Sequence, residues 1–117
     1  MTPLRLVHTD VVTCSLTEAV GEVRARVEAS HYRLALVVSE GGVLLGRVRC
    51  AALEGDPQRT AEEVVEPGPS TVRPDAVPSE LAERLRSRDL RTALVTTPEG
   101  VLIGIVLRED LEQSTRP

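Results

Sequence analysis

The sequence predicts an α/β (α+β) protein made of two copies of one β-α-β-β-α unit, packed with pseudo-two-fold symmetry. Two observations predict it. First, residues 11–53 align without a gap on residues 69–111, at a fixed offset of 58 positions, and about 30% of the aligned residues are identical. Second, each copy contains apolar residues at helical spacing, followed by two runs of β-branched residues that are joined by a turn containing glycine. Duplication of one unit is therefore the strongest inference from the sequence.

Each copy places an amphipathic helix after a short extended start. In the first copy, Ser15 and Glu18 fit a capping box at the beginning of the helix. In the second copy, Asp75 is the expected N-cap. Apolar residues at helical spacing predict the buried faces. These residues are Ala19, Val20, Val23 and Val27 in the first copy, and Val77, Leu81 and Leu85 in the second.

The strands are expected to be buried on both faces, because they are apolar almost throughout. The predicted strand pairs are 35–38 with 43–48, and 93–97 with 101–107. Short extended segments at 11–13 and 70–72 come before the helices. Short helices are expected after the strands, near Ala51 and near Glu109.

The repeats divide the chain into residues 1–54 as the first repeat, 55–68 as a linker and 69–117 as the second repeat. Within the linker, Thr60 and Glu63 fit a capping box for a short helix through Val65. The repeats leave no residues for another domain. We therefore expect one module that stands alone.

Composition narrows the classes of function. The net charge is −4 and aromatic residues make up 1%, which disfavours a nucleic-acid binder. The longest apolar run, residues 101–107, is too short for a membrane helix, and the first residues lack the apolar core of a signal peptide. All basic residues are arginine, which indicates a GC-rich and bacterial source. We expect a cytoplasmic protein in which Cys14 and Cys50 are reduced.

Catalytic and metal-binding patterns are missing from the sequence. It contains no Gly-x-Ser-x-Gly, phosphate-loop or His-Glu-x-x-His motif. His8 and His31 lack partners at the spacing of a metal site or a catalytic triad, so both are expected on the surface. We expect neither an enzyme nor a metal protein.

The order, spacing and duplication of these elements resemble a tandem CBS-domain pair, also called a Bateman module. The second copy carries the resemblance best, where Gly104 begins the pattern Gly-h-h-x-x-x-Asp-Leu that ends at Leu111 (h, apolar). The resemblance implies a homodimer that regulates a partner enzyme or transporter. It implies an adenosine nucleotide (AMP, ADP, ATP or S-adenosylmethionine) as ligand, with no required cofactor. The alternative is a degenerate pair that serves as a dimerisation or protein-interaction scaffold without a ligand.

The resemblance also implies a site, in which Asp110 would bind the ribose hydroxyls. Leu107 stands where the family has a hydroxyl residue, and the first copy has Arg49 and Ala52 at the two positions. One asymmetric site near Asp110 is therefore expected. The alternative for Asp110 is an acid that complements the helix dipole.

Three further groups of residues complete the expected site, each with a structural alternative. Thr71 and Thr92 are expected to line the same pocket, or to be ordinary strand residues. Arg49 and Arg91 are the expected phosphate ligands, because a guanidinium suits phosphate. The alternative for both arginines is a surface ion pair with a glutamate.

Overall fold

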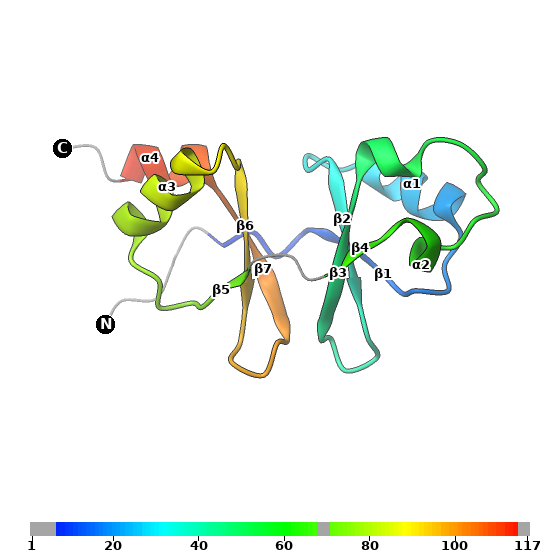
Figure 1. Cartoon of the computed structure of the whole chain (residues 1–117), viewed down its shortest axis with the longest axis horizontal. Helices are drawn as coiled ribbons and strands as arrows, with labels where there is room; N and C mark the ends of the chain where they lie inside the picture. Colours follow the sequence, from blue (N-terminus) through cyan, green and yellow to red (C-terminus); the bar gives the residue numbers. More distant parts are fainter. Residues whose placement is uncertain (1–6, 68–70, 115–117) are drawn as a thin grey trace. The chain divides into compact units, whose positions relative to one another are not determined.

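The computed structural model describes residues 7–67 and 71–114, and within them the chain forms two small sheets and four α-helices (Figure 1). The predicted mixed class is confirmed. The first repeat holds β1 (Val12–Cys14), α1 (Val20–Glu28), β2 (Leu34–Val38), β3 (Leu44–Arg49) and the 3-10 helix η1 (Cys50–Leu53), and the linker holds α2 (Ala61–Val64) and β4 (Glu66–Pro67). The second holds β5 (Thr71–Val72), α3 (Pro78–Ser87), β6 (Thr92–Thr96), β7 (Leu102–Leu107) and α4 (Arg108–Ser114).

The two sheets have matching topology. In the first repeat, the order is β1-β2-β3-β4, with β1 parallel to β2 and the other pairs antiparallel. In the second repeat the order is β5-β6-β7, with β5 parallel to β6 and β7 antiparallel to it. Val37 pairs with Gly46 in the first repeat, as Val95 pairs with Gly104 in the second, and each register shifts directly afterwards. Within each repeat, the helices lie on one face of the sheet (Figure 1).

Each repeat has its own apolar core between its sheet and its helices. Strand residues that alternate along the chain point at the helices, as the period of two requires. In the first repeat the core includes Val23, Val37 and Leu53, and in the second it includes Leu81, Val95 and Leu111. β2 is buried along most of its length, as predicted, but the prediction that the strands are buried on both faces is wrong for β3, where Leu45 is 38% exposed.

The helices begin later than the sequence suggested. Ser15 N–H does donate to Glu18 Oε2 at 2.7 Å, but this bond closes a turn, and α1 begins only at Val20. Asp75 is not the N-cap of α3. That position is Val77, because Pro78 supplies a first helical residue that needs no N–H partner. In the linker, the predicted capping box of α2 is present, and Thr60 N–H donates to Glu63 Oε2 at 2.9 Å.

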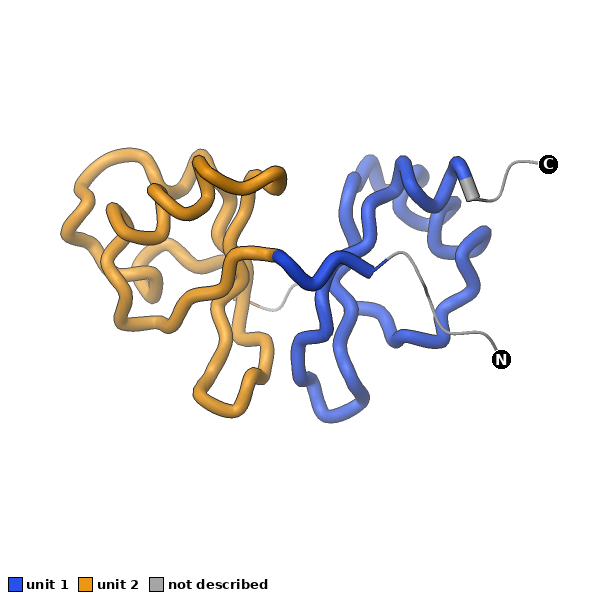
Figure 2. The backbone as a smooth tube through the Cα atoms, turned by 180° about the vertical axis from the view of Figure 1, so that it is seen from behind, with its two compact units in different colours: residues 1–10, 70–117 blue, residues 11–69 orange. Residues whose placement is uncertain are grey.

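The described residues fall into two compact units, and residues 7–10 belong to the same unit as residues 71–114 (Figure 2). The reason is a backbone bridge, in which His8 N–H donates to the Ile105 carbonyl at 2.7 Å and Ile105 N–H donates back at 3.0 Å. Residues 11–67 form the other group, which includes the linker. Among the described residues, no helix has the length and apolar character needed to cross a membrane.

Candidate functional site

The candidate site in the second repeat lies where β7 ends and α4 begins. Leu107 is the register partner of Thr92, the first residue of β6. Directly after Leu107 the chain turns into α4, and Arg108 N–H donates to the Arg91 carbonyl at 2.8 Å. Asp110 lies in the first turn of α4. The strand register and the turn into α4 therefore bring four predicted site residues to one end of the second repeat. They are Arg91, Thr92, Leu107 and Asp110.

Asp110 has a partner that sequence reasoning missed. Its Oδ2 lies 2.8 Å from His8 Nε2, and both side chains are about one-third exposed, at 30% and 35%. His8 reaches this position because its backbone is bonded on both sides to Ile105. The expectation that His8 is a surface residue therefore missed the contact of its side chain with Asp110. A pair separated by 102 positions leaves no local pattern in the sequence.

The first repeat shows the corresponding arrangement with different side chains. Glu66 stands 58 positions after His8, and its backbone pairs with Arg47, which stands 58 positions before Ile105. The Glu66 carboxylate contacts Arg49 Nε at 3.2 Å and Arg47 Nη2 at 3.5 Å. The ion-pair alternative for Arg49 is thus the one that the structure displays. In both repeats, a segment outside the repeat places a polar side chain against the strand end, because His8 contacts the second repeat and Glu66 contacts the first.

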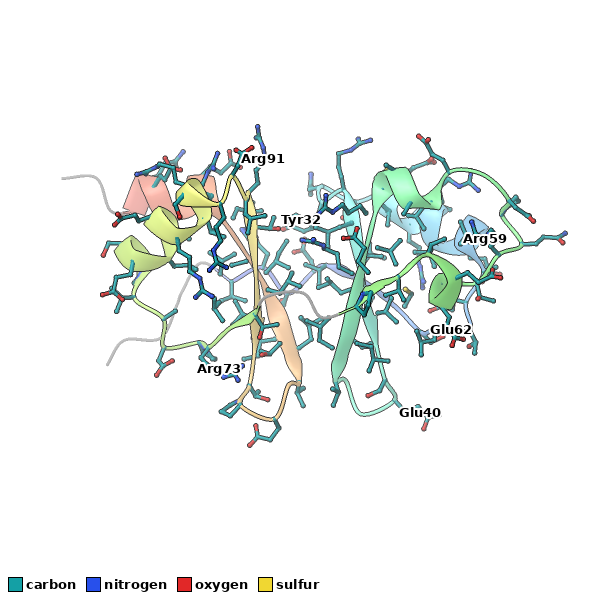
Figure 3. All side chains as sticks on the ribbon, in the orientation of Figure 1. Tyr32, Glu40, Arg59, Glu62, Arg73 and Arg91 are labelled. Atoms are coloured by element: carbon teal, nitrogen blue, oxygen red, sulfur yellow. The ribbon has the colours of Figure 1, made fainter. Side chains whose placement is uncertain are left out.

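Thr71 and Arg49 lie apart from Asp110, and the side chain of Arg91 points outward. Thr71 lies on β5, opposite Leu94, so β6 separates it from Leu107 on β7. Arg91 is exposed and extends outward where α3 leads into β6 (Figure 3). Arg49 belongs to the equivalent end of the first repeat.

This end of the second repeat offers groups for recognition. The Asp110 carboxylate supplies two acceptor oxygens, which suit a vicinal diol, and the Arg91 guanidinium supplies donors for an anion. Within residues 7–67 and 71–114, no group of three or more His, Cys, Asp or Glu side chains is placed to hold a metal ion. The Asp110 and Arg91 side chains can form hydrogen bonds and charge pairs.

The cysteines contribute no chemistry to this end. Burial raises the pKa of the Cys14 thiol to about 11, and Glu18 adds to the rise while Arg26 opposes it. Cys14 is 4% exposed and belongs to the first repeat's core. Cys50 is half-buried, and its Sγ accepts from Arg33 Nη2 at 3.6 Å. A thiol with a raised pKa is a poor nucleophile at neutral pH, because the thiolate is the reactive form.

Comparison with known proteins identifies the fold. The family model of the CBS domain matches residues 61–113, which run from α2 through β5, α3, β6 and β7 to all but the last residue of α4. The cytosolic domain of the Mg²⁺ channel MgtE, solved in complex with ATP, is similar at a TM-score of 0.84 and 26% identity, over 93% of this chain and 46% of that one. This chain thus spans about half the length of that relative. No curated protein sequence matches the chain.

Two further solved structures resemble nearly the whole chain. One is the CBS domain of a bacterial CNNM/CorC family Mg²⁺ transporter in complex with ATP, with a TM-score of 0.78 and 23% identity over 96% of this chain and 85% of that one. The other is a CBS domain pair/ACT domain protein from Thermotoga maritima, with a TM-score of 0.82 and 17% identity over 97% and 95% of the two chains. These similarities cover both repeats and show a common fold.

Proposed function

We propose that this chain is a member of the CBS domain family, whose model matches residues 61–113, and that it is a regulatory module that binds an adenosine nucleotide at the Asp110 end of its second repeat. The observation that carries the proposal is the position of Asp110, in the first turn of α4 beside the end of β7. Two of the similar structures, MgtE and the CNNM/CorC protein, were solved with ATP, which supports this class of ligand.

In this proposal Asp110 accepts hydrogen bonds from the ribose hydroxyls. Arg91 is exposed at the same end of the repeat and is the proposed phosphate ligand. Thr92 and Leu107, which are register partners on β6 and β7, form one wall of the proposed site. Thr71 on β5 also lines it. Because His8 Nε2 already contacts Asp110 Oδ2, a ribose diol has to share that oxygen or displace the imidazole. Ligand binding would then be coupled to the segment that carries His8.

The first repeat has a different end, which supports a single asymmetric site. Ala52 stands where Asp110 stands, and Arg49 stands where Leu107 stands. Glu66 neutralises Arg49 from within the chain. This end has no carboxylate at the ribose position, so we propose no nucleotide there.

Titration calorimetry with AMP, ADP, ATP and S-adenosylmethionine tests the proposal. We expect saturable binding of at least one of them, and an affinity about tenfold lower in Asp110→Asn, since a hydrogen bond to a charged acceptor is lost. Glu109→Gln is the matched control, because Glu109 is exposed in the same helical turn, and it should bind as the parent does. Absence of heat from all four ligands at millimolar concentration would reject nucleotide binding.

The second candidate is a scaffold without a ligand, which pairs with copies of itself or with a partner enzyme or transporter. It is favoured by the fact that both strand ends already have partners within the chain, His8 on Asp110 and Glu66 on Arg49. Light scattering distinguishes the candidates when it is combined with the titration. A stable homodimer that binds none of the four nucleotides supports the scaffold, and a monomer that binds one of them rejects it. In neither case do we propose catalysis.

A further inference from the structure

The Asp110 carboxylate, which the proposed function assigns to a ribose, already has a partner within the chain. Its Oδ2 lies 2.8 Å from His8 Nε2. Because a carboxylate only accepts hydrogen bonds, the imidazole Nε2 carries a hydrogen and donates it. A ribose hydroxyl would donate to the carboxylate in the same way. The imidazole N–H of His8 is therefore the same kind of partner for this oxygen as a hydroxyl of the ligand.

The backbone holds His8 beside Asp110. His8 N–H donates to the Ile105 carbonyl at 2.7 Å, and Ile105 N–H donates to the His8 carbonyl at 3.0 Å. Gly104 allows this close crossing, since a Cβ at that position would collide with the His8 carbonyl. From Ile105, β7 continues to Leu107 and the chain then turns into α4. The bridge thus brings the imidazole to the first turn of α4, where Asp110 lies.

In the part of the chain that the structure describes, the segment that carries His8 pairs with β7 over a single residue. His8 and Ile105 form an isolated bridge, whereas β4 in the linker pairs with β3 at two successive residues. Before His8, Val7 packs against the core of the second repeat. After it, Thr9 and Asp10 are exposed. A short edge contact of this kind opens at lower cost than a strand inside a sheet, so the segment can move while the repeat stays folded.

The contact between His8 and Asp110 is also easy to exchange. The two side chains are 35% and 30% exposed, so solvent reaches both. A partly exposed pair adds little to stability, because water solvates the two groups again when they separate. A ligand that breaks this contact would lose no more than about fivefold in affinity. The imidazole is therefore a partner that a ligand with several contacts can replace.

The first repeat shows that the crossing side chain is matched to the group at the strand end. Glu66 stands 58 positions after His8, and its carboxylate contacts Arg47 and Arg49 on β3. The crossing segment thus carries a carboxylate where the first repeat has arginines. It carries an imidazole donor where the second repeat has Asp110. Each strand end has a complementary partner from within the chain, and in the second repeat a ribose would have to replace that partner.

We propose that His8 occupies the ribose position at Asp110 in the free chain, and that a nucleotide displaces the imidazole when it binds. This inference rests on the proposed function and adds the regulation of the same site. A ribose diol that donates to both carboxylate oxygens needs Oδ2 as well as Oδ1. Oδ2 is the oxygen that His8 Nε2 contacts. The displacement therefore follows from the acceptor that the two donors have in common.

Displacement of the imidazole would give the ligand an effect beyond its own site. Residues 7–10 lead directly into β1, the first strand of the first repeat (Figure 2). Because the ligand binds only when the imidazole has left Asp110, it shifts this segment toward its released state. A nucleotide at Asp110 thus loosens the segment through which the chain enters its first repeat.

Titration calorimetry with AMP, ADP, ATP and S-adenosylmethionine compares His8→Ala with the parent. We expect His8→Ala to bind about two- to fivefold more tightly, because the ribose no longer competes with an imidazole. Loss of a residue with a purely structural role would not raise the affinity. The 2′-deoxy form of the ligand that binds lacks one hydroxyl and can leave His8 on Oδ2, so His8→Ala should gain nothing for it. Thr9→Ala is the matched control on the same segment and should bind as the parent does, because Thr9 is exposed.

The proton spectrum of the imidazoles reports the displacement without relying on affinity, since the chain has only two histidines. The ring signals of His8, identified by their loss in His8→Ala, should move in Asp110→Asn without any nucleotide. A saturating nucleotide should move the His8 signals of the parent in the same direction, because the ring loses the carboxylate in both cases. His31, which lies between α1 and β2, is the internal control, and its signals should stay in Asp110→Asn.

Three results would overturn this inference and leave nucleotide binding intact. The first is that His8→Ala binds nucleotide no more tightly than the parent, which would show that imidazole and ribose share the carboxylate. The second is an equal gain for the 2′-deoxy ligand, which would place the competition away from the ribose. The third is that the His8 ring signals stay unchanged in Asp110→Asn or with saturating nucleotide. If neither the parent nor His8→Ala binds any of the four ligands, the proposed function fails as well, so the two failures are distinguishable. Circular dichroism establishes that each variant is folded.

Discussion

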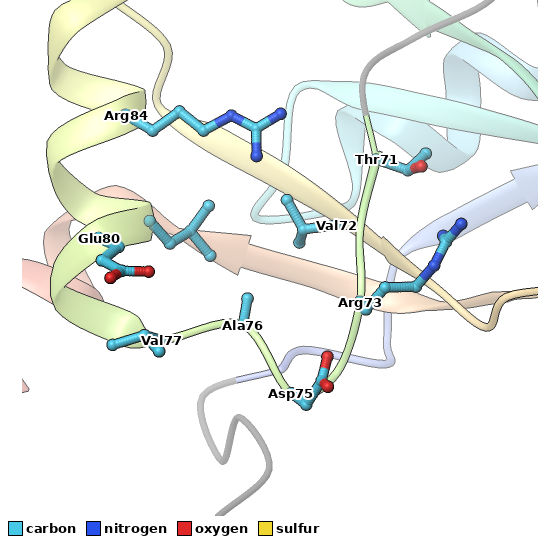
Figure 4. Close-up of a pocket in the computed structure, with 9 residues that line it drawn as sticks. Thr71, Val72, Arg73, Asp75, Ala76, Val77, Glu80 and Arg84 are labelled. Atoms are coloured by element: carbon cyan, nitrogen blue, oxygen red, sulfur yellow. The ribbon is translucent and has the colours of Figure 1, made fainter.

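The two repeats share a backbone and differ in what covers it. The register from Val37 to Gly46 is repeated from Val95 to Gly104, and the hydrogen bond from Cys50 N–H to the Arg33 carbonyl is repeated from Arg108 to Arg91. The first repeat is covered by α2, whereas the described residues of the second repeat leave a pocket beside α3 (Figure 4). Core positions and close backbone contacts constrain a duplicated fold, whereas side chains at strand ends and helix rims can diverge at little cost.

The sharpest test of the shared scaffold is a matched pair of core truncations. Leu53 and Leu111 are equivalent, fully buried members of the two cores. Leu53→Ala and Leu111→Ala should each lower the free energy of unfolding by about 2–5 kcal/mol, since each leaves a cavity. Urea denaturation measures this loss, with Leu45→Ala, at a 38% exposed position, as the control that costs little. If one truncation costs less than half of the other, the cores are not equivalent.

The next largest effect is expected at the two glycines where an edge segment crosses a strand. A Cβ on Gly104 would collide with the His8 carbonyl and lie 2.8 Å from Val7 Cγ1, and one on Gly46 would lie 2.7 Å from the Glu66 carbonyl oxygen. Gly46→Ala and Gly104→Ala should therefore each cost about 1–3 kcal/mol, since the crossing segment must move.

Hydrogen exchange shows where the structure is loosened. Gly104→Ala should speed exchange of the His8 and Ile105 amides, because each of these amides donates to the backbone carbonyl of the other residue. Gly41→Ala is the control, because its nearest neighbour would be Ser39 Oγ at 4.0 Å. Unchanged protection of both amides in Gly104→Ala would show that the segment tolerates the methyl group.

The sequence predicted the shared scaffold because its signals are local. Apolar periodicity and turn glycines located the strand pairs to within a residue or two, and Thr60 with Glu63 located α2. Where a prediction was wrong, a nearby residue had overridden it. Pro78 fixed the start of α3 more strongly than Asp75 could, and the Ser15–Glu18 pair closed a turn ahead of α1.

The contacts of the site residues could not be predicted from the sequence, for a different reason. His8 meets Asp110 and Glu66 meets Arg49 because segments distant in sequence add to the edges of the sheets. Pairing of this kind has no periodicity of its own. The repeat did contain a signal, since His8 and Glu66 are 58 positions apart, and so are Arg47 and Ile105. Knowing one pairing would have predicted the other.

The last expected effect is a difference between the two repeats in how pH changes their stability. Cys14 lies in the first core where the second has Val72. Burial, the larger cause, and Glu18 raise the pKa of its thiol from 9.0 to about 11. The folded chain therefore holds this proton more tightly than the unfolded chain does. The resulting stability is fully present below pH 9 and is lost as the pH rises through 11.

Cys14→Val, which installs the residue of the second repeat, should therefore remove part of the alkaline loss of stability while changing little at pH 7. A shift of this size corresponds to about 2–3 kcal/mol at most. Urea denaturation at several pH values from 7 to 11 measures it as the difference between variant and parent, which cancels the titration of other groups. Cys50→Ala is the control, since Cys50 is only half-buried. Parallel stability curves for parent and Cys14→Val would show that the thiol keeps its ordinary pKa in the fold, and that the two cores are alike in their response to pH as well as in their packing.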